Sequence, residues 1–245
     1  MVTGRPQLIA HRGFAGEFQE NTLEAVQGSI GMADAIELDV RQCGSGDLVI
    51  VHDPYVGDGH ATREIEQLSV STLSSAEPPV PTLESVLAVV PDDQRLVLEL
   101  KDPKAADDLG MLLHQSKQNA VISATDGRAL SRISQRYPDL ETAFLHIPPL
   151  GERLFWKLAY HLPISRVHRY DTTKLISQAN RASCNEIHLR YELCLQTEIV
   201  QQAHKAGLTI AAWTVNSPAD YLALRNLGVD GIISDTWRVD SSLDS

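Results

Sequence analysis

Charged residues follow four short apolar runs in this chain, and their types suit one kind of chemistry. The four pieces are His11-Arg12-Gly13, Glu37-Leu38-Asp39, His52-Asp53 and Glu99-Leu100-Lys101. Charged groups are costly to bury, so those at the end of an apolar strand usually serve a site at the mouth of that strand. If the four strand ends converge, their imidazoles, carboxylates and cationic side chains meet in one pocket. Such a pocket is suited to a metal-assisted phosphoryl reaction.

Three of the carboxylates are the candidate metal ligands. Strand alternation puts Glu37 and Asp39 on one face, and it puts Glu99 and Lys101 on one face of another strand. Carboxylates within ~4 Å repel by about 4 kcal/mol per pair at an effective dielectric constant of about 20, so they must protonate, separate or share a cation. Oxygen ligands favour Mg²⁺, Ca²⁺ or Mn²⁺ over zinc. The alternative is that these acids form buried ion pairs with nearby basic residues. Two separate strands that both end in acids favour the metal site.

Two histidines are the candidate general acid and base. Imidazole titrates close to physiological pH, so His11 and His52 have the right chemistry for proton transfer. Of the remaining histidines, His146 and His188 lie in predicted strands and are secondary candidates for the same mouth. The others are interpreted as surface or core residues.

Arg12 and Lys101 are the candidate phosphate contacts. Arginine offers a planar fork of donors and lysine a compact point charge. Lys101 has two alternatives, an ion pair with a neighbouring acid and a Schiff base in a lyase or aldolase. The neighbouring carboxylates would keep its ammonium protonated, which argues against the Schiff base.

Composition narrows the class of protein. The 245 residues are 43% hydrophobic, which is ample for a core. The formal net charge is −11, with 32 acidic against 21 basic residues, which argues against a nucleic-acid binder. An acidic surface of this kind would suit a high-salt cytoplasm, although a pI near 5 is also common in ordinary proteins. Three cysteines without CxxC spacing indicate neither a disulfide framework nor a zinc knuckle. No apolar run approaches the ~18 residues of a transmembrane segment, so we expect a cytoplasmic protein.

Strand and helix patterns alternate along the whole chain, which predicts a parallel sheet. The helices are expected at 23–30, 83–90, 104–117, 126–136, 195–206 and 218–227. An eight-stranded α/β barrel accommodates the strands if 47–52 returns beside 35–40 as a hairpin. The alternative is an open doubly wound sheet, but residues 11–16 only weakly match its glycine-rich phosphate turn. The barrel is favoured because its functional residues lie at the C-terminal ends of the strands. The strands are expected at 7–12, 35–40, 47–52, 96–101, 120–124, 142–146, 185–189, 208–214 and 230–234.

Eight short pieces occur in order along residues 8–236: HRG at 11–13, ENT at 20–22, ELDV at 37–40, HD at 52–53, PTLE at 81–84, LELK at 98–101, WTVN at 213–216 and GVDGIISD at 228–235. Their order and spacing together resemble those of the glycerophosphodiester phosphodiesterases. The resemblance implies a TIM (β/α)8 barrel, one domain over 1–245, with a short insertion after the second barrel strand. It implies hydrolysis of glycerophosphodiesters to sn-glycerol 3-phosphate and an alcohol with one divalent cation. Carried over position by position, the matched residues are Glu37, Asp39 and Glu99 as metal ligands, His11 and His52 as the acid–base pair, Arg12 and Lys101 as phosphate contacts, and Trp213 as an aromatic of the substrate pocket.

Other functions remain open at this stage. They are lysophospholipase D-type hydrolysis of a lipid phosphodiester, the Lys101 lyase or aldolase, and a non-catalytic phosphate-binding relative. The attacking group is either water or the glycerol hydroxyl beside the phosphate. Residues 154–160 are rich in aromatics, which is typical of a helix packed on the barrel or on a second subunit of a homo-oligomer; a transient lipid contact is the alternative.

Overall fold

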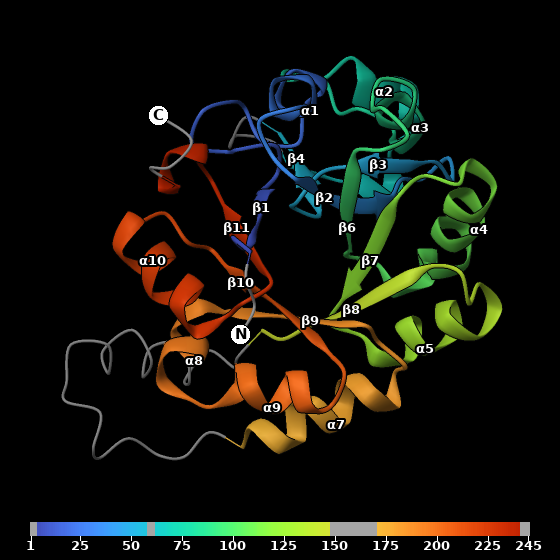
Figure 1. Cartoon of the computed structure of the whole chain (residues 1–245). Coiled ribbons are helices and arrows are strands. Elements are labelled where there is room, and N and C mark those ends of the chain that lie inside the picture. Colours follow the sequence, from blue (N-terminus) through green and yellow to red (C-terminus); the bar gives the residue numbers. More distant parts are fainter. Residues whose placement is uncertain (1–3, 58–61, 148–170, 241–245) are drawn as a thin grey trace.

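Parallel strands close into a barrel in this computed structural model, which describes residues 4–57, 62–147 and 171–240 (Figure 1). Eight such strands form the ring in these residues, and β1 pairs with both β11 and β2, which closes it. The predicted barrel is therefore confirmed, and the open doubly wound sheet is wrong. The strands are β1 (Gln7–Ala10), β2 (Ala35–Gln42), β6 (Arg95–Leu100), β7 (Ala120–Ala124), β8 (Glu141–Leu145), β9 (Glu186–Arg190), β10 (Thr209–Trp213) and β11 (Gly231–Ser234).

Apolar side chains lie on both faces of these strands, as expected for parallel strands that are buried on both faces. The inward side chains fill the barrel, where Ile9, Val97 and Ile233 belong to one buried cluster. The outward side chains, among them Leu38 and Leu98, pack in a larger cluster with the surrounding helices. The filled interior leaves space for a site only at an end of the barrel.

Helices surround the strands (Figure 1), and several of them begin where a side chain caps the first turn. Thr22 accepts from the backbone N–H of Ala25 at 3.2 Å, and Ser217 caps the predicted last helix. The predicted stretch 104–117 begins as a 3-10 turn, η2 (Pro103–Ala105), before the α-helix proper. The helices around the barrel are α1 (Leu23–Ser29), α3 (Leu83–Leu87), α4 (Ala106–Ser116), α5 (Gly127–Arg136), α7 (Thr172–Arg181), α8 (Tyr191–Gln196), α9 (Ile199–Lys205) and α10 (Pro218–Leu227), with η4 (Trp237–Val239) near the end.

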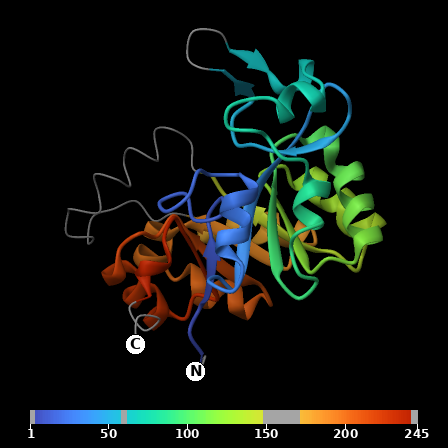
Figure 2. The ribbon, with the colours of Figure 1, turned by 90° about the horizontal axis from the view of Figure 1, so that it is seen from above.

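A small insertion lies between β2 and α3, as the resemblance implies, and it stands to one side of the barrel (Figure 2). Its first strand, β3 (Leu48–Ile50), runs antiparallel to the end of β2, which confirms the predicted hairpin. The insertion has its own buried cluster, which includes Val49, Ile65 and Leu73. Its other elements are β4 (Tyr55–Val56), β5 (Arg63–Glu64), η1 (Ile65–Gln67) and α2 (Val70–Ser74).

Two expectations concern contact with membranes. Among the described residues, no helix has the length and apolar character needed to cross a bilayer. The aromatic piece at 154–160 lies outside the described residues.

Candidate active site

Two adjacent strands bring the three acidic residues together at one end of the barrel. In the register of β2 and β6, Asp39 lies directly beside Glu99, and Glu37 lies two residues earlier on the same face of β2. One carboxylate oxygen from each of Glu37, Asp39 and Glu99 lies within 4.8 Å of the others. Glu37 and Asp39 are buried, and Glu99 is partly exposed. The predicted convergence of these acids is thus present.

Asp39 is surrounded by positive charge. Its Oδ1 lies 2.8 Å from Lys101 Nζ, and its Oδ2 lies 3.2 Å from Arg12 Nε and accepts from Asn21 Nδ2 at 2.8 Å. Burial opposes ionisation of Asp39, but these cations and the Asn21 hydrogen bond outweigh it and lower the pKa of the carboxyl. Asp39 therefore stays ionised in the buried floor of the site.

Glu37 is in the opposite situation. Burial, followed by the charge of Asp39, raises its pKa to about 8, and its one backbone hydrogen bond, from Arg12 N at 2.9 Å, does not compensate. A divalent cation with oxygen ligands would relieve the repulsion among these three carboxylates, two of which are buried, so the residues fit such an ion.

His11 follows β1 and makes contacts on both sides of its ring. Its Nδ1 lies 2.6 Å from Asp235 Oδ1, and its Nε2 lies 4.0 Å from Glu37 Oε2. Burial disfavours the charged imidazole, but the hydrogen bond to Asp235 and the charge of Glu37 outweigh it and raise the pKa of His11. Asp235 thus holds the ring with Nε2 toward the acids.

The turn after β1 explains how His11 and Arg12 reach the site. The predicted strand 7–12 ends earlier, at Ala10, because Arg12, Gly13 and Phe14 have φ values of 51°, 76° and 61°. A Cβ on Gly13 would lie 2.7 Å from the Cβ of Ala25 on α1, so only glycine fits there. This left-handed turn directs the Arg12 N–H to Glu37, and such backbone strain is typical of functional sites.

The two cations are held by acids from different elements. Arg12 Nη1 donates to both carboxylate oxygens of Glu20, at 3.0 and 2.9 Å, while its Nε contacts Asp39. Lys101 Nζ pairs with both Asp39 and Glu99. The ion pairs that the sequence leaves as an alternative to a metal site are therefore present, and they belong to the same cluster.

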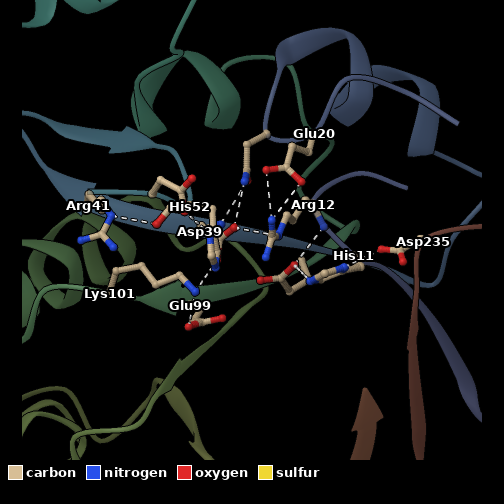
Figure 3. Close-up of polar contacts among 12 residues, drawn as sticks. His11, Arg12, Glu20, Asp39, Arg41, His52, Glu99, Lys101 and Asp235 are labelled. Atoms are coloured by element: carbon tan, nitrogen blue, oxygen red, sulfur yellow. Dashed lines mark hydrogen bonds and ion pairs between the residues drawn. The ribbon is translucent and has the colours of Figure 1, made fainter. Parts of the chain in front are cut away.

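His52 lies across the site from His11, and Arg12 lies between them in the view of Figure 3. Its Nδ1 contacts Asp53 Oδ1 at 2.8 Å, and its side chain is 36% exposed. Arg41 Nε donates to the His52 carbonyl at 2.9 Å, which fixes the backbone where β3 leaves the sheet. The more open His52 thus faces solvent, whereas His11 lies deeper.

A cavity of about 240 Å³ connects these groups. Both candidate histidines line it, and so do Trp213 and His188, whereas His146 is not one of its described lining residues. Trp213 Nε1 is buried without a partner in the described ranges. Of the predicted site residues, Asp39 alone is absent from the lining, because Arg12, Lys101 and Asn21 cover it.

Comparison with known proteins shows the family of this chain. Residues 11–239 match the glycerophosphoryl diester phosphodiesterase family. The chain belongs to this family. It is 30% identical over 247 residues to a Bacillus subtilis protein provisionally named a glycerophosphodiester phosphodiesterase, and the match covers 93% of each chain. Members of the family are phosphoric diester hydrolases, and this chain is an enzyme of that class.

Solved structures of glycerophosphodiester phosphodiesterases share the fold. The enzyme of Thermotoga maritima gives a TM-score of 0.80 at 24% identity and covers 98% of this chain and 99% of its own. A phosphodiesterase of Oleispira antarctica, in complex with the product sn-glycerol-3-phosphate, gives a TM-score of 0.73 at 22% identity and 98% coverage of both chains. At these identities the likeness shows the fold alone.

Three site residues of this family member were not identified from the sequence as part of the site. They are Glu20, Asn21 and Asp235, which contact Arg12, Asp39 and His11 respectively. Asp235 directly follows the strand expected at 230–234, so the rule that identified the other strand ends also applies to it. Glu20 and Asn21 lie in a loop, where no strand pattern marks them.

Proposed function

We propose that this chain hydrolyses glycerophosphodiesters to sn-glycerol 3-phosphate and an alcohol. The observation that carries the proposal is the cluster of Glu37, Asp39 and Glu99 at a cavity that both candidate histidines line. The family supplies the reaction class, and the Oleispira relative binds the same product. Glu37, Asp39 and Glu99 would hold one Mg²⁺, Ca²⁺ or Mn²⁺ ion. When bound, this ion would act as a Lewis acid on a phosphate oxygen.

Arg12 and Lys101 bind the phosphate in this proposal. Both cations are already fixed by acids, so they need little reorganisation when a phosphate arrives. They draw charge from the phosphate oxygens, which lowers the barrier to attack at phosphorus. Trp213 forms the apolar wall beside them.

His11 and His52 transfer the protons. Asp235 occupies Nδ1 of His11, so its Nε2 is the atom that exchanges a proton with the reacting groups. His52 lines both this cavity and a second one of about 620 Å³ between the 19–22 loop and the insertion. On this ground we assign the leaving alcohol to His52 and the attacking hydroxyl to His11; the attacking hydroxyl belongs to water or is the neighbouring glycerol hydroxyl.

The Schiff-base alternative is disfavoured by the surroundings of Lys101. Burial lowers the pKa of its ammonium, but Asp39 and Glu99 outweigh burial and raise it. A lysine that stays protonated is a poor nucleophile toward a carbonyl group. Lys101 therefore suits a phosphate contact.

Release of glycerol 3-phosphate tests the proposal. Glycerophosphocholine, glycerophosphoethanolamine, glycerophosphoglycerol and lysophosphatidylcholine are each offered with Mg²⁺, Ca²⁺ or Mn²⁺, and with a chelator as control. We expect release from a water-soluble diester that stops on chelation, and a loss of about 10²–10⁴ in rate for His52→Ala. Choline release from lysophosphatidylcholine alone would favour the lysophospholipase D alternative. No release with any ion would indicate a non-catalytic phosphate-binding relative.

A further inference from the structure

A chain of polar contacts leads from the start of β9 to the cavity. On β9, His188 Nε2 lies 3.1 Å from Glu186 Oε2, and Glu186 Oε1 accepts from Arg95 Nη2 at 2.6 Å. Arg95 also pairs with Glu141 at 2.6 Å. His188 is 1% exposed, yet it lines the cavity that holds the candidate catalytic groups. The proposed mechanism does not use this histidine.

Glu186 determines which nitrogen of His188 carries the proton. Burial opposes ionisation of Glu186, but the contacts with His188 and Arg95 outweigh it and lower its pKa. An ionised carboxylate only accepts hydrogen bonds, so Nε2 of His188 must be the donor. In the neutral ring, Nδ1 then carries the lone pair and is an acceptor.

This acceptor is open to the cavity. Within the described ranges, the Glu186 contact is the one side-chain hydrogen bond of His188, so Nδ1 has no partner there. Among the described residues, the solvent-inaccessible side-chain atoms without a hydrogen-bond partner include Trp213 Nε1 but not Nδ1 of His188. Since the residue is otherwise buried, solvent or a ligand reaches Nδ1 from the cavity.

The position of β9 in the ring indicates what Nδ1 meets. Going round the barrel from β2, β9 is the fourth strand in either direction, so His188 faces Glu37 and Asp39 from the opposite wall. The phosphate cations Arg12 and Lys101 follow β1 and β6, on the two sides of β2. A lone pair repels phosphate oxygens but accepts from a hydroxyl.

We propose that His188 Nδ1 accepts a hydrogen bond from a glycerol hydroxyl of the substrate and so selects a glycerol phosphoryl group. This inference rests on the proposed function. Glu186 and Arg95 are positioning residues in it, because they act through the His188 tautomer. A site built to bond a hydroxyl discriminates against the analogue that lacks it.

Binding of two product analogues tests the inference without turnover. Calorimetry in the presence of Mg²⁺ compares the binding of sn-glycerol 3-phosphate with that of propyl phosphate, whose carbon chain carries no hydroxyl. In the wild type we expect the glycerol phosphate to bind at least about tenfold tighter. His188→Phe should bring the ratio of the two affinities close to one, and it should change the affinity for propyl phosphate by less than about twofold. His188→Gln, whose amide both donates and accepts, should retain part of the ratio.

A fallback variant and a control variant complete the binding experiment. If His188→Phe fails to fold by circular dichroism, Glu186→Gln serves, because a carboxamide no longer fixes the tautomer, and we expect a partial loss of the ratio. His114→Gln, on α4 outside the barrel, is the matched control and should match the wild type. An unchanged ratio in folded His188→Phe, or equal weakening of both ligands, overturns the inference. If sn-glycerol 3-phosphate binds more tightly than propyl phosphate but no diester is hydrolysed, the proposed function is overturned and the inference stands. If diesters are hydrolysed but both ligands bind equally well, the inference is overturned and the proposed function stands.

Discussion

His11 Nδ1 and Asp235 Oδ1 lie 2.6 Å apart, although the two residues are 224 positions apart in the sequence. Asp235 is itself held by Asn216, whose Nδ2 donates to Asp235 Oδ2 at 2.6 Å and whose Oδ1 accepts from Asp235 N at 2.9 Å. The loops after β1, β10 and β11 thus cooperate to orient one imidazole. Since β1 pairs with β11, closure of the barrel is what makes the contact.

Removing the charge of Asp235 should weaken catalysis through His11. In Asp235→Asn we expect kcat to fall by about 10- to 100-fold, because the His11 ring loses its preferred tautomer. The hydrogen bond to Asp235 raises the pKa of His11, so this pKa should fall in the variant. Imidazole NMR titration of the metal-free protein measures it, and Asp139→Asn, beside the remote His114, is the control. An unchanged pKa of His11 would show that the contact is not formed in solution.

Glu37 should make the stability of the metal-free protein depend on pH. Its pKa in the folded protein is about 8, above the ordinary value of 4.5, so folding favours the protonated form. Its contribution to stability is present below about pH 4.5 and is lost as the pH rises through about 8. Thermal unfolding with a chelator should show a larger fall in Tm from pH 5 to 8 for the wild type than for Glu37→Gln, by a few degrees. A divalent ion should restore the Tm of the wild type at pH 8 but not that of the variant. Equal pH dependence of Tm in the two proteins would contradict the prediction.

Gly13→Ala should harm both stability and activity. Its φ of +76° costs an alanine about 1–2 kcal/mol, and the new methyl group would also lie 2.9 Å from the backbone carbon of Ala25. The turn must then shift, and Arg12 and His11 with it, so we expect at least a tenfold loss of kcat/KM. Gly31→Ala is a matched control, because Gly31 has the same φ of +76° and nothing lies within 4 Å of its Cβ position. Chemical denaturation and steady-state kinetics separate the two effects, and equal behaviour of the two variants would exclude the steric explanation.

Lys101→Met should lower turnover without abolishing metal binding. The variant removes one phosphate contact, and a loss of about 10²-fold in kcat/KM is typical for a charged group that stabilises a transition state. Lys104→Met is the control, because Lys104 is exposed and pairs with Glu66 in the insertion. Borohydride with a carbonyl substrate should trap nothing on the wild type. A trapped adduct at Lys101 would instead support the Schiff-base alternative.

Strand-end residues were predictable because period-two alternation and apolar runs are local properties of the chain. Glu37, Asp39 and Glu99 were identified in this way, and they do converge. The hairpin at β3 was also predictable, from the turn residues between it and β2. The early end of β1 was not, because the left-handed turn at Arg12 and Gly13 depends on contact with Ala25 of α1.

The sequence by itself determined the class of fold, the family and the chemical types gathered at the strand ends, since pattern, order and spacing are written along the chain. Only the tertiary structure decided which groups are partners: Asp235 with His11, Glu20 with Arg12, and Glu186 with His188. Pairing depends on barrel closure and on loop conformation, which bring together residues that are distant in sequence. Burial is likewise a property of the folded chain, and it is the reason that Glu37 and Asp39, two residues apart on one strand, have pKa values shifted in opposite directions.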